Sequence, residues 1–355
     1  MSRKGQAKEV RVPPDALKQF IERIFRHAGC RRSDARTIAS CMVQTNLWGI
    51  DSHGVIRTPE YRERLIKGAV NARPRIQKLK SGGSFEVLDA DNGAGFVGAT
   101  AGMKRAIELA AETAISAVGV INSNHCGATA LYARMAASQG MIGIAMSNVA
   151  PNMVMPGVKT PITGNNPIAV AIPTFAEFPF CLDISLSAVA GGKLLVAAKK
   201  GEEIPLGWAT DKEGNPTTDA KAGFDGYLLP MGGHKGFGLS LMVDLLCGVI
   251  TGGAFQNHIK SMYRYPDDPS RTAHLMLVMN PLVLMSEEQL GERMREFVET
   301  LRETPVRSDT EILLPGELEY RSECKRRSDG IPLPSAVFEE ITRIGNEIDR
   351  SMENE

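Results

Sequence analysis

The sequence contains little of what marks the specialised classes of protein. Its 41 Lys and Arg residues balance its 41 Asp and Glu residues, so no excess of charge indicates a nucleic-acid or membrane partner. No apolar run approaches the length of a membrane span, and the polar first residues lack the apolar core of a signal peptide. We therefore expect a cytoplasmic protein whose partners are neither nucleic acids nor membranes.

The signatures of several enzyme classes are missing as well. None of the six cysteines forms a C-x-x-C pair and most have apolar neighbours, which predicts reduced, mostly buried thiols. The chain has no G-x-S-x-G, no H-E-x-x-H and no Walker loop, so serine hydrolases, zincins and P-loop enzymes are not indicated. No third ligand stands at a recognisable spacing from Asp51 and His53, so we expect no metal site.

The spacing of apolar residues predicts an α/β body within a helical frame. Residues 1–12 have the composition of a loose tail, and amphipathic helical patterns follow to about residue 67. Short apolar runs then alternate with helical patterns, as in α/β proteins. The runs predict strands at Phe85–Leu88, Ala117–Ile121, Ile142–Met146, Ile168–Ile172, Phe180–Ile184 and Leu275–Met279. We place a first helical part at 13–78, an α/β domain at 79–272 and a second helical part at 273–350.

A glycine-rich run brackets one histidine and one lysine. Gly232-Gly-His-Lys-Gly-Phe-Gly238 leads directly into a helical pattern whose apolar stripe begins at Leu239. Glycines let backbone approach a ligand closely, and a helix N-terminus attracts anions, to which Lys235 adds a fixed charge. The run predicts a phosphate or carboxylate site. The alternative is a flexible turn before a core helix.

A second glycine run, Gly93-Ala-Gly-Phe-Val-Gly98, fits the dinucleotide fingerprint G-x-G-x-x-G. The fingerprint also requires an acidic residue after the next strand, to bind a ribose hydroxyl. That strand ends in Asn122-Ser-Asn124, which has no carboxylate. We therefore favour a turn that packs a helix against a strand and contacts no nucleotide.

Two histidine motifs carry the candidate chemistry. In Asp51-Ser-His-Gly54, His53 is able to exchange a proton near neutral pH, Ser52 to orient it, and Arg57 to hold a carboxylate. The alternative is a capped turn with a surface histidine. In Asn124-His-Cys-Gly-Ala-Thr129, His125 follows a strand end, where α/β proteins bind ligands, although the start of a helix without chemistry fits too.

Together these motifs resemble those of the type-2 malate/L-lactate dehydrogenase family, in the family's order and over most of the chain. The family reduces 2-oxo acids or cyclic imino acids with a nicotinamide cofactor and includes sulfolactate and ureidoglycolate dehydrogenases. The matching runs are Asp51-Ser-His-Gly-Val-Ile-Arg57, Asn124-His-Cys-Gly-Ala128, Gly164-Asn-Asn-Pro-Ile-Ala169, Asp183-Ile-Ser185, Gly207-Trp-Ala-Thr-Asp211, Gly214-Asn-Pro-Thr-Thr-Asp219, Leu229-Pro-Met-Gly-Gly-His-Lys-Gly236 and Leu314-Pro-Gly-Glu317.

The resemblance implies a non-Rossmann fold, with an α/β nucleotide-binding domain inserted in a mostly helical domain, assembled as a homodimer. It gives His53 and Ser52 catalytic roles and places Arg57 on the substrate carboxylate. In some members the position of His125 is the acid/base, so the choice between the two imidazoles stays open. It places the cofactor, NAD or NADP with NAD favoured, near His125, Cys126, Gly127, Ala128, Thr129, Asp183, Ile184, Ser185, His234, Lys235, Leu314, Pro315, Gly316 and Glu317.

The expected reaction is hydride transfer between a nicotinamide cofactor and a 2-hydroxy or 2-oxo acid. One alternative is reduction of a cyclic 2-imino acid such as piperideine-2-carboxylate, and another is a catalytically idle nucleotide-binding protein. Asn165 stands where the family usually has threonine, near the substrate, so the identity of the acid is the open question.

Overall fold

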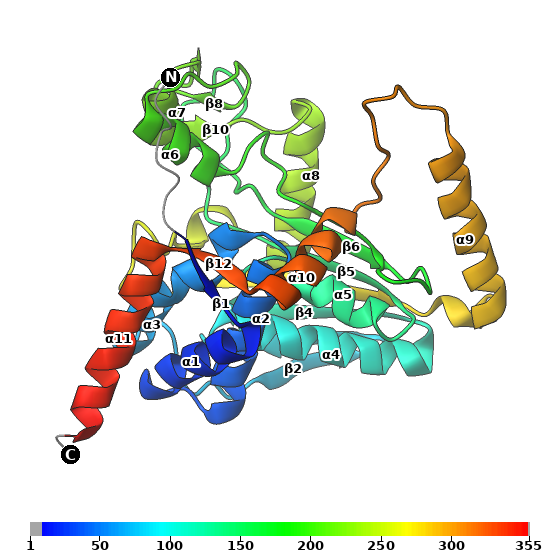
Figure 1. Ribbon diagram of the computed structural model, residues 1–355, viewed down its shortest axis with the longest axis horizontal. Coiled ribbons are helices and arrows are strands. Elements are labelled where there is room, and N and C mark those ends of the chain that lie inside the picture. The colour runs from blue at the N-terminus through cyan, green and yellow to red at the C-terminus, as the bar shows by residue number, and fades with distance from the viewer. Residues whose placement is uncertain (1–8, 354–355) are drawn as a thin grey trace.

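The computed structural model describes residues 9–353 and is built on a seven-stranded mixed sheet (Figure 1). The strand order is β2-β3-β4-β11-β5-β6-β7, in which only β3 and β4 run parallel. The strands are β2 Gln77–Gly82, β3 Phe85–Asp89, β4 Ile115–Ser123, β5 Ile142–Ser147, β6 Ile168–Ile172, β7 Phe180–Ile184 and β11 Thr272–Met279. The six predicted strands are confirmed, and β2 is the strand of this sheet that the apolar pattern missed.

Helices cover both faces of the sheet. On one face lie α4 (Gly95–Thr113) and α5 (Ala130–Ala137), which pack on one another and run side by side in Figure 1. On the other face, α8 (His234–Asp244) and its π-helical continuation η3 (Leu245–Val249) bury Val243 and Cys247 in one cluster with sheet residues. The apolar stripe predicted from Leu239 is therefore only partly in the core, because Leu239 itself is exposed.

Both ends of the chain build the helical part. β1 (Glu9–Val12) pairs antiparallel with β12 (Ile331–Pro334), so residues 9–12 are not the loose tail predicted, and residues 1–8 lie outside the described residues. Helix α1 packs on α2 and α11, and α2 packs on α10. The helices are α1 Pro14–His27, α2 Arg32–Leu47, α3 Thr58–Ile66, α10 Glu317–Asp329 and α11 Ser335–Glu353.

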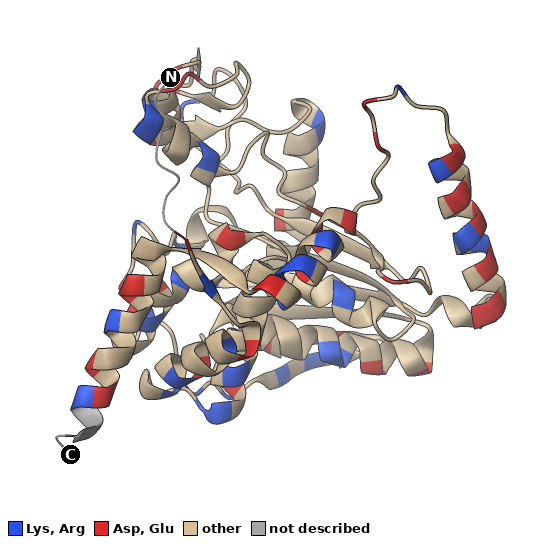
Figure 2. Cartoon of the chain, in the orientation of Figure 1, with Lys and Arg blue, Asp and Glu red and all other residues tan. Residues whose placement is uncertain are grey.

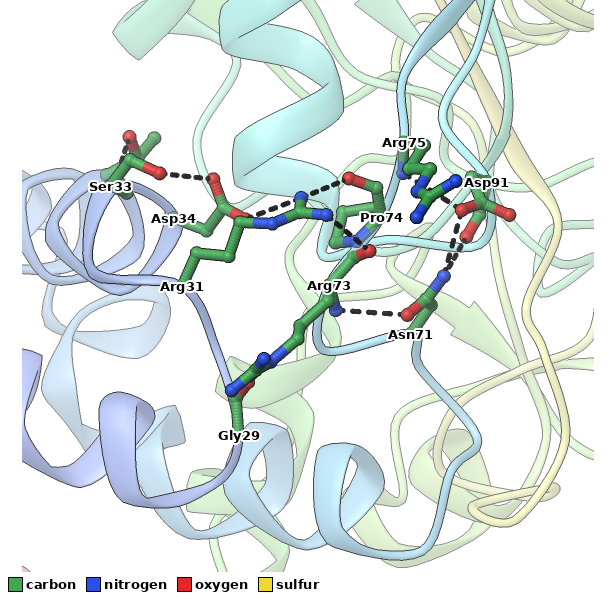
Figure 3. A network of polar contacts seen from close by, with 10 residues as sticks. Gly29, Arg31, Ser33, Asp34, Asn71, Arg73, Pro74, Arg75 and Asp91 are labelled. Carbon is green, nitrogen blue, oxygen red and sulfur yellow. Dashed lines mark hydrogen bonds and ion pairs between the residues drawn. The ribbon is translucent and has the colours of Figure 1, made fainter.

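A polar network joins this helical part to the sheet (Figure 3). Arg31, at the start of α2, donates hydrogen bonds to the carbonyl oxygens of Arg73 and Pro74. In the same segment Asn71 donates to the carboxylate of Asp91, which lies in the turn between β3 and α4. The segment between α3 and β2 is thereby bonded on both sides, which fixes the helices against the sheet edge.

The remaining elements form a small lobe and an outlying helix. In the lobe, β10-β8-β9 pack with α6 and α7 around Met153 and Leu194. Helix α9 stands apart from the sheet in Figure 1 and begins with a capping box of Ser286 and Gln289. These elements, with the short turns, are α6 Gly191–Lys200, β8 Ala209–Thr210, β9 Pro216–Thr217, α7 Ala220–Asp225, β10 Tyr227–Leu228, α9 Glu287–Glu303, η1 Asp51–His53, η2 Val55–Arg57, η4 Gln256–His258 and η5 Pro281–Val283.

The division into a two-part helical frame with an α/β insertion remains a proposal. We draw the second boundary after Met279 rather than at 272. The reason is that β11 is hydrogen-bonded on both sides, to β4 and to β5, and therefore belongs to the sheet. Within residues 9–353, no helix is both long and apolar enough to cross a bilayer.

Gly95 packs closely against the backbone of Asn124 and His125. A Cβ at this position would lie 2.1 Å from the carbonyl oxygen of Asn124 and 2.4 Å from that of His125. Gly95→Ala should therefore lower the free energy of unfolding by about 1–3 kcal/mol, measured by urea denaturation. The control is Gly192→Ala in α6, where a Cβ meets nothing within 4 Å and should stabilise by about 0.5–1 kcal/mol. Equal stabilities for the two variants would contradict the close packing at Gly95.

Candidate active site

The turn that carries His53 is held by the side chain of Asn46 in α2. The Asn46 Oδ1 atom accepts the backbone N–H of Val55 at 2.8 Å, and its Nδ2 donates to Asp51 at 2.6 Å. A Cβ at position 54 would lie 2.2 Å from Asn46 Oδ1, so only glycine fits there. The run Asp51–Arg57 thus folds as two short 3₁₀ turns, η1 and η2, joined at Gly54 and held by one buried amide.

Helix α10 holds the same turn through Arg326. Arg326 donates to both carboxylate oxygens of Asp51, at 2.6 and 3.0 Å, and also to the carbonyl oxygen of Asn46. Asp51 is therefore engaged in an ion pair. Within residues 9–353, no three His, Cys, Asp or Glu side chains gather as metal ligands would.

The structure brings His53 and His125 together, although 72 positions of sequence separate them. Their rings stack with centroids 5.6 Å apart at an interplanar angle of 24°. Burial, and then the charge of Arg57, lower the pKa of His53 to about 4. Burial, followed by His53 and Arg57, lowers the pKa of His125 to about 3. Both imidazoles are therefore neutral at pH 7 and able to accept a proton or donate a hydrogen bond.

Arg57 lies in the same cluster and keeps one nitrogen available. Its Nε donates to the carbonyl oxygen of Ser52 at 3.0 Å, its Nη1 pairs with Glu60 at 3.0 Å, and its guanidinium lies 5.4 Å from the centre of the Tyr263 ring. Within the described part of the chain, Nη2 has no hydrogen-bond partner. The Ser52 hydroxyl lies 2.9 Å from His53 Nδ1, as an orienting residue would.

His125 leads directly into the first of the predicted cofactor segments. After it, Cys126 and Ala128 are buried, and burial raises the pKa of the Cys126 thiol to about 12, which leaves it unreactive. Thr129 Oγ1 donates to Asp183 at 2.6 Å, and the backbone N–H of Ala130 donates to the same carboxylate at 2.9 Å. Asp183 therefore caps α5, and burial raises its pKa.

Strand β7 and the residues just after it are hydrogen-bonded to the other predicted segments. The N–H of Cys181 donates to the carbonyl oxygen of Pro315 at 2.8 Å, which attaches the Leu314–Glu317 segment. Just after β7, the N–H of Leu186 donates to Asn165, and its carbonyl oxygen accepts the N–H of Met231. The sequence-predicted residues therefore lie along β7: the 314–317 segment is bonded near its first residues, Asp183 and Ile184 are its last residues, and Asn165 is bonded just beyond its end.

The turn before α8 has the form of an anion site. Gly232 and Gly233 have φ values of 59° and 63°, and a Cβ at either would meet nothing within 4 Å. His234 and Lys235 are exposed in the first turn of the helix. Open glycine backbone beside helix N–H groups and a lysine fits a phosphate group. Gly95 is the opposite case, since its backbone is closed by Asn124 and His125, which confirms the predicted packing of the Gly93–Gly98 run.

The carboxylate of Glu317 is committed to protein partners. It accepts hydrogen bonds from Arg302 and Arg321, both at 2.7 Å, and from the N–H of Leu314 at 3.1 Å. Gly316, with φ of 95°, packs against Cys181. A contact of Leu314, Pro315, Gly316 or Glu317 with a cofactor stays a prediction.

Sequence reasoning missed the residues that support the two imidazoles. These residues are Asn46, Glu60, Tyr61, Tyr263 and Arg326. Tyr61 had a signal, because it follows Arg57 by four residues and therefore shares its helical face. For Arg326 no sequence pattern indicates a contact with a residue 275 positions earlier.

Comparison with known proteins agrees with these observations. Residues 12–342 match the family described as malate/L-lactate dehydrogenase. The chain is 38% identical over 359 residues to a malate dehydrogenase of Pyrococcus abyssi, covering 98% of each chain. It resembles the structure of a sulfolactate dehydrogenase from Methanocaldococcus jannaschii, with TM-score 0.89, 33% identity and coverage of 96% of this chain and 98% of that one. A delta1-piperideine-2-carboxylate reductase from Pseudomonas syringae gives TM-score 0.86 at 29% identity, covering 94% and 99%.

Fold and relatives define the class as an oxidoreductase that transfers a hydride between a nicotinamide cofactor and a 2-hydroxy or 2-oxo acid. The chain belongs to the malate/L-lactate dehydrogenase family. The family and fold expected from the sequence are confirmed, and the alternative of a catalytically idle protein is not supported.

The lowered pKa values predict an unusual pH profile. In 2-hydroxy acid oxidation the base must be neutral, and here both imidazoles stay neutral down to about pH 5. The kcat/KM for oxidation should therefore be level from about pH 9 to about pH 5.5 and fall only below that range, as the rings take up protons. Initial rates in overlapping buffers measure this. A fall centred near 6.5, the ordinary pKa of histidine, would show that burial does not control these rings.

Proposed function

We propose that His53 exchanges the proton of this reaction and that Arg57 holds the carboxylate of the substrate. The observation that carries the proposal is the cluster of two neutral imidazoles beside a guanidinium whose Nη2 is unpaired within residues 9–353. A carboxylate on Nη2 would sit on the charge that acts on both rings, and Ser52 would keep His53 oriented.

The proton step follows from these groups. Reduction of a 2-oxo acid places negative charge on the carbonyl oxygen, and a protonated His53 gives that oxygen its proton. The charge of Arg57 lowers the pKa of His53. A bound carboxylate offsets that charge, so the imidazole takes up a proton more readily once the acid is bound. In oxidation the neutral ring takes the hydroxyl proton. Arg57 also fixes which face of the carbonyl group is presented.

The residues around β7 and α8 would hold the cofactor, which supplies or accepts the hydride when bound. Gly232, Gly233 and Lys235 fit its phosphates, and the segment from His125 to Thr129 connects one of the imidazoles to Asp183 of β7. We keep NAD as the favoured cofactor over NADP, to be decided by assay with both. Cytoplasmic location stays a prediction.

Malate is the first candidate substrate, because the Pyrococcus relative is a malate dehydrogenase. The family likeness to a piperideine-2-carboxylate reductase keeps a cyclic 2-imino acid as the second candidate. A panel of 2-hydroxy acids, 2-oxo acids and the cyclic imine, followed at the absorbance of the reduced nicotinamide, separates the two.

A substitution of Arg57 tests the proposed carboxylate contact. Lysine keeps the charge of Arg57, but its single nitrogen cannot bond Ser52, Glu60 and a substrate carboxylate as three separate guanidinium nitrogens do, so it places the charge less firmly. Arg57→Lys should lower kcat/KM for every 2-oxo acid by about tenfold or more, which corresponds to about 1.4 kcal/mol, and leave cofactor affinity unchanged. Arg343→Lys, on the exposed face of α11, is the matched control. If the wild-type enzyme reduced a simple aldehyde as well as a 2-oxo acid, the carboxylate role of Arg57 would be wrong.

We also propose that the protein is a homodimer joined through α8. Apolar side chains of α8 and its continuation are exposed in the single chain. These side chains are Leu239, Met242, Leu245, Val249 and Ile250. Between Gly236 and Ile250 the one charged residue is Asp244, which is buried, and most of α8 is uncharged in Figure 2. An apolar stripe of this size on a free surface marks an interface, and a second copy presents the same stripe to it.

The dimer is tested by mass in solution. Light scattering should give twice the chain mass of 38.4 kDa, and Leu245→Asp should shift it toward the monomer because a charge in an apolar interface is costly. Leu79→Asp on the edge strand β2 should leave the dimer intact. A wild-type monomer at micromolar concentration would contradict the proposal.

A further inference from the structure

Two hydrogen-bond donors point at the same nitrogen of His125. The Tyr61 hydroxyl oxygen lies 2.7 Å from Nδ1, and the backbone N–H of Gly127 donates to Nδ1 at 3.4 Å. A neutral imidazole has one N–H donor and one acceptor nitrogen. A backbone N–H is always a donor, so Nδ1 must be the acceptor and the ring proton must lie on Nε2.

One aromatic ring holds both donors in place. The Tyr61 ring meets Phe96 edge-on, with centroids 5.5 Å apart at 84°. Gly127 has φ of 72°, and a Cβ there would lie 2.7 Å from the Phe96 ring, so the backbone at this position is fixed and requires glycine. Burial raises the pKa of Tyr61 well above its ordinary value, so its hydroxyl keeps the proton it donates. The arrangement is therefore built by the packing of Tyr61 and Gly127 against Phe96.

We propose that Tyr61 is a positioning residue that holds His125 in its Nε2–H tautomer, so that His125 donates a hydrogen bond to the reacting oxygen while His53 exchanges the proton. The part of this inference that concerns the reacting oxygen rests on the proposed function. His125 Nε2 has no hydrogen-bond partner among residues 9–353, which leaves it for a ligand. A fixed donor stabilises the negative oxygen that forms during reduction, and the proton from His53 then completes the hydroxyl group.

The test combines a tautomer measurement with kinetics. In nitrogen-15 NMR of the histidine-labelled enzyme, with His125→Gln to assign the resonance, wild-type His125 should show a protonated Nε2 and an unprotonated Nδ1. Tyr61→Phe keeps the ring on Phe96 but removes the stronger donor. We expect it to mix the two tautomers, raise the pKa of His125, and lower kcat about tenfold with KM nearly unchanged.

Tyr132→Phe is the matched control, because Tyr132 is a fully buried tyrosine nearby whose hydroxyl donates to the carbonyl oxygen of Cys126. It should leave the His125 resonances unchanged. A wild-type ring protonated on Nδ1, or an unchanged tautomer in Tyr61→Phe, would overturn the inference. The NMR measurement needs no substrate, so an enzyme inactive on every acid would contradict the proposed function while the spectra still decided the role of Tyr61.

Discussion

Two imidazole rings stack 5.6 Å apart in a region where little water reaches them, and they share it with a guanidinium. Burial disfavours a charge on either ring, Arg57 adds to that effect at both rings, and His53 adds to it at His125. A positive charge on an imidazole is therefore disfavoured, while the positive charge of Arg57 attracts an anion. A bound carboxylate offsets the charge of Arg57, the smaller of the two causes that lower the pKa of His53, so substrate binding favours the protonated ring and is linked to proton transfer.

The rest of the fold serves to assemble this cluster from distant parts of the chain. Asp51 is fixed by Arg326 of α10, so the C-terminal helical part determines where His53 lies. His125 is placed by the end of β4 and by Phe96 at the start of α4, which supports both Gly127 and Tyr61. A network of this kind couples stability to function, because loosening the helical part would move one imidazole relative to the other.

The sequence predicted those elements whose signal is local. The limits of β6 and β7 follow from short apolar runs bounded by turns, and the histidine motifs are contiguous enough to be read directly. By contrast β2, which is exposed throughout and rich in lysine, has no apolar alternation, because an edge strand needs none. The pairing of β1 with β12, the clamp of Arg326 on Asp51 and the cap that Asp183 provides for α5 depend on tertiary contacts, which no local pattern encodes.

The central claim is that the substrate acid binds between Arg57 and the imidazole pair. A crystal structure of the enzyme with nicotinamide cofactor and oxamate, an unreactive analogue of a 2-oxo acid, tests it most directly. The account predicts the oxamate carboxylate on the guanidinium of Arg57 and the remaining carbonyl oxygen within hydrogen-bond distance of His53 and His125. An oxamate bound away from Arg57, or a carbonyl oxygen that contacts neither imidazole, would contradict it.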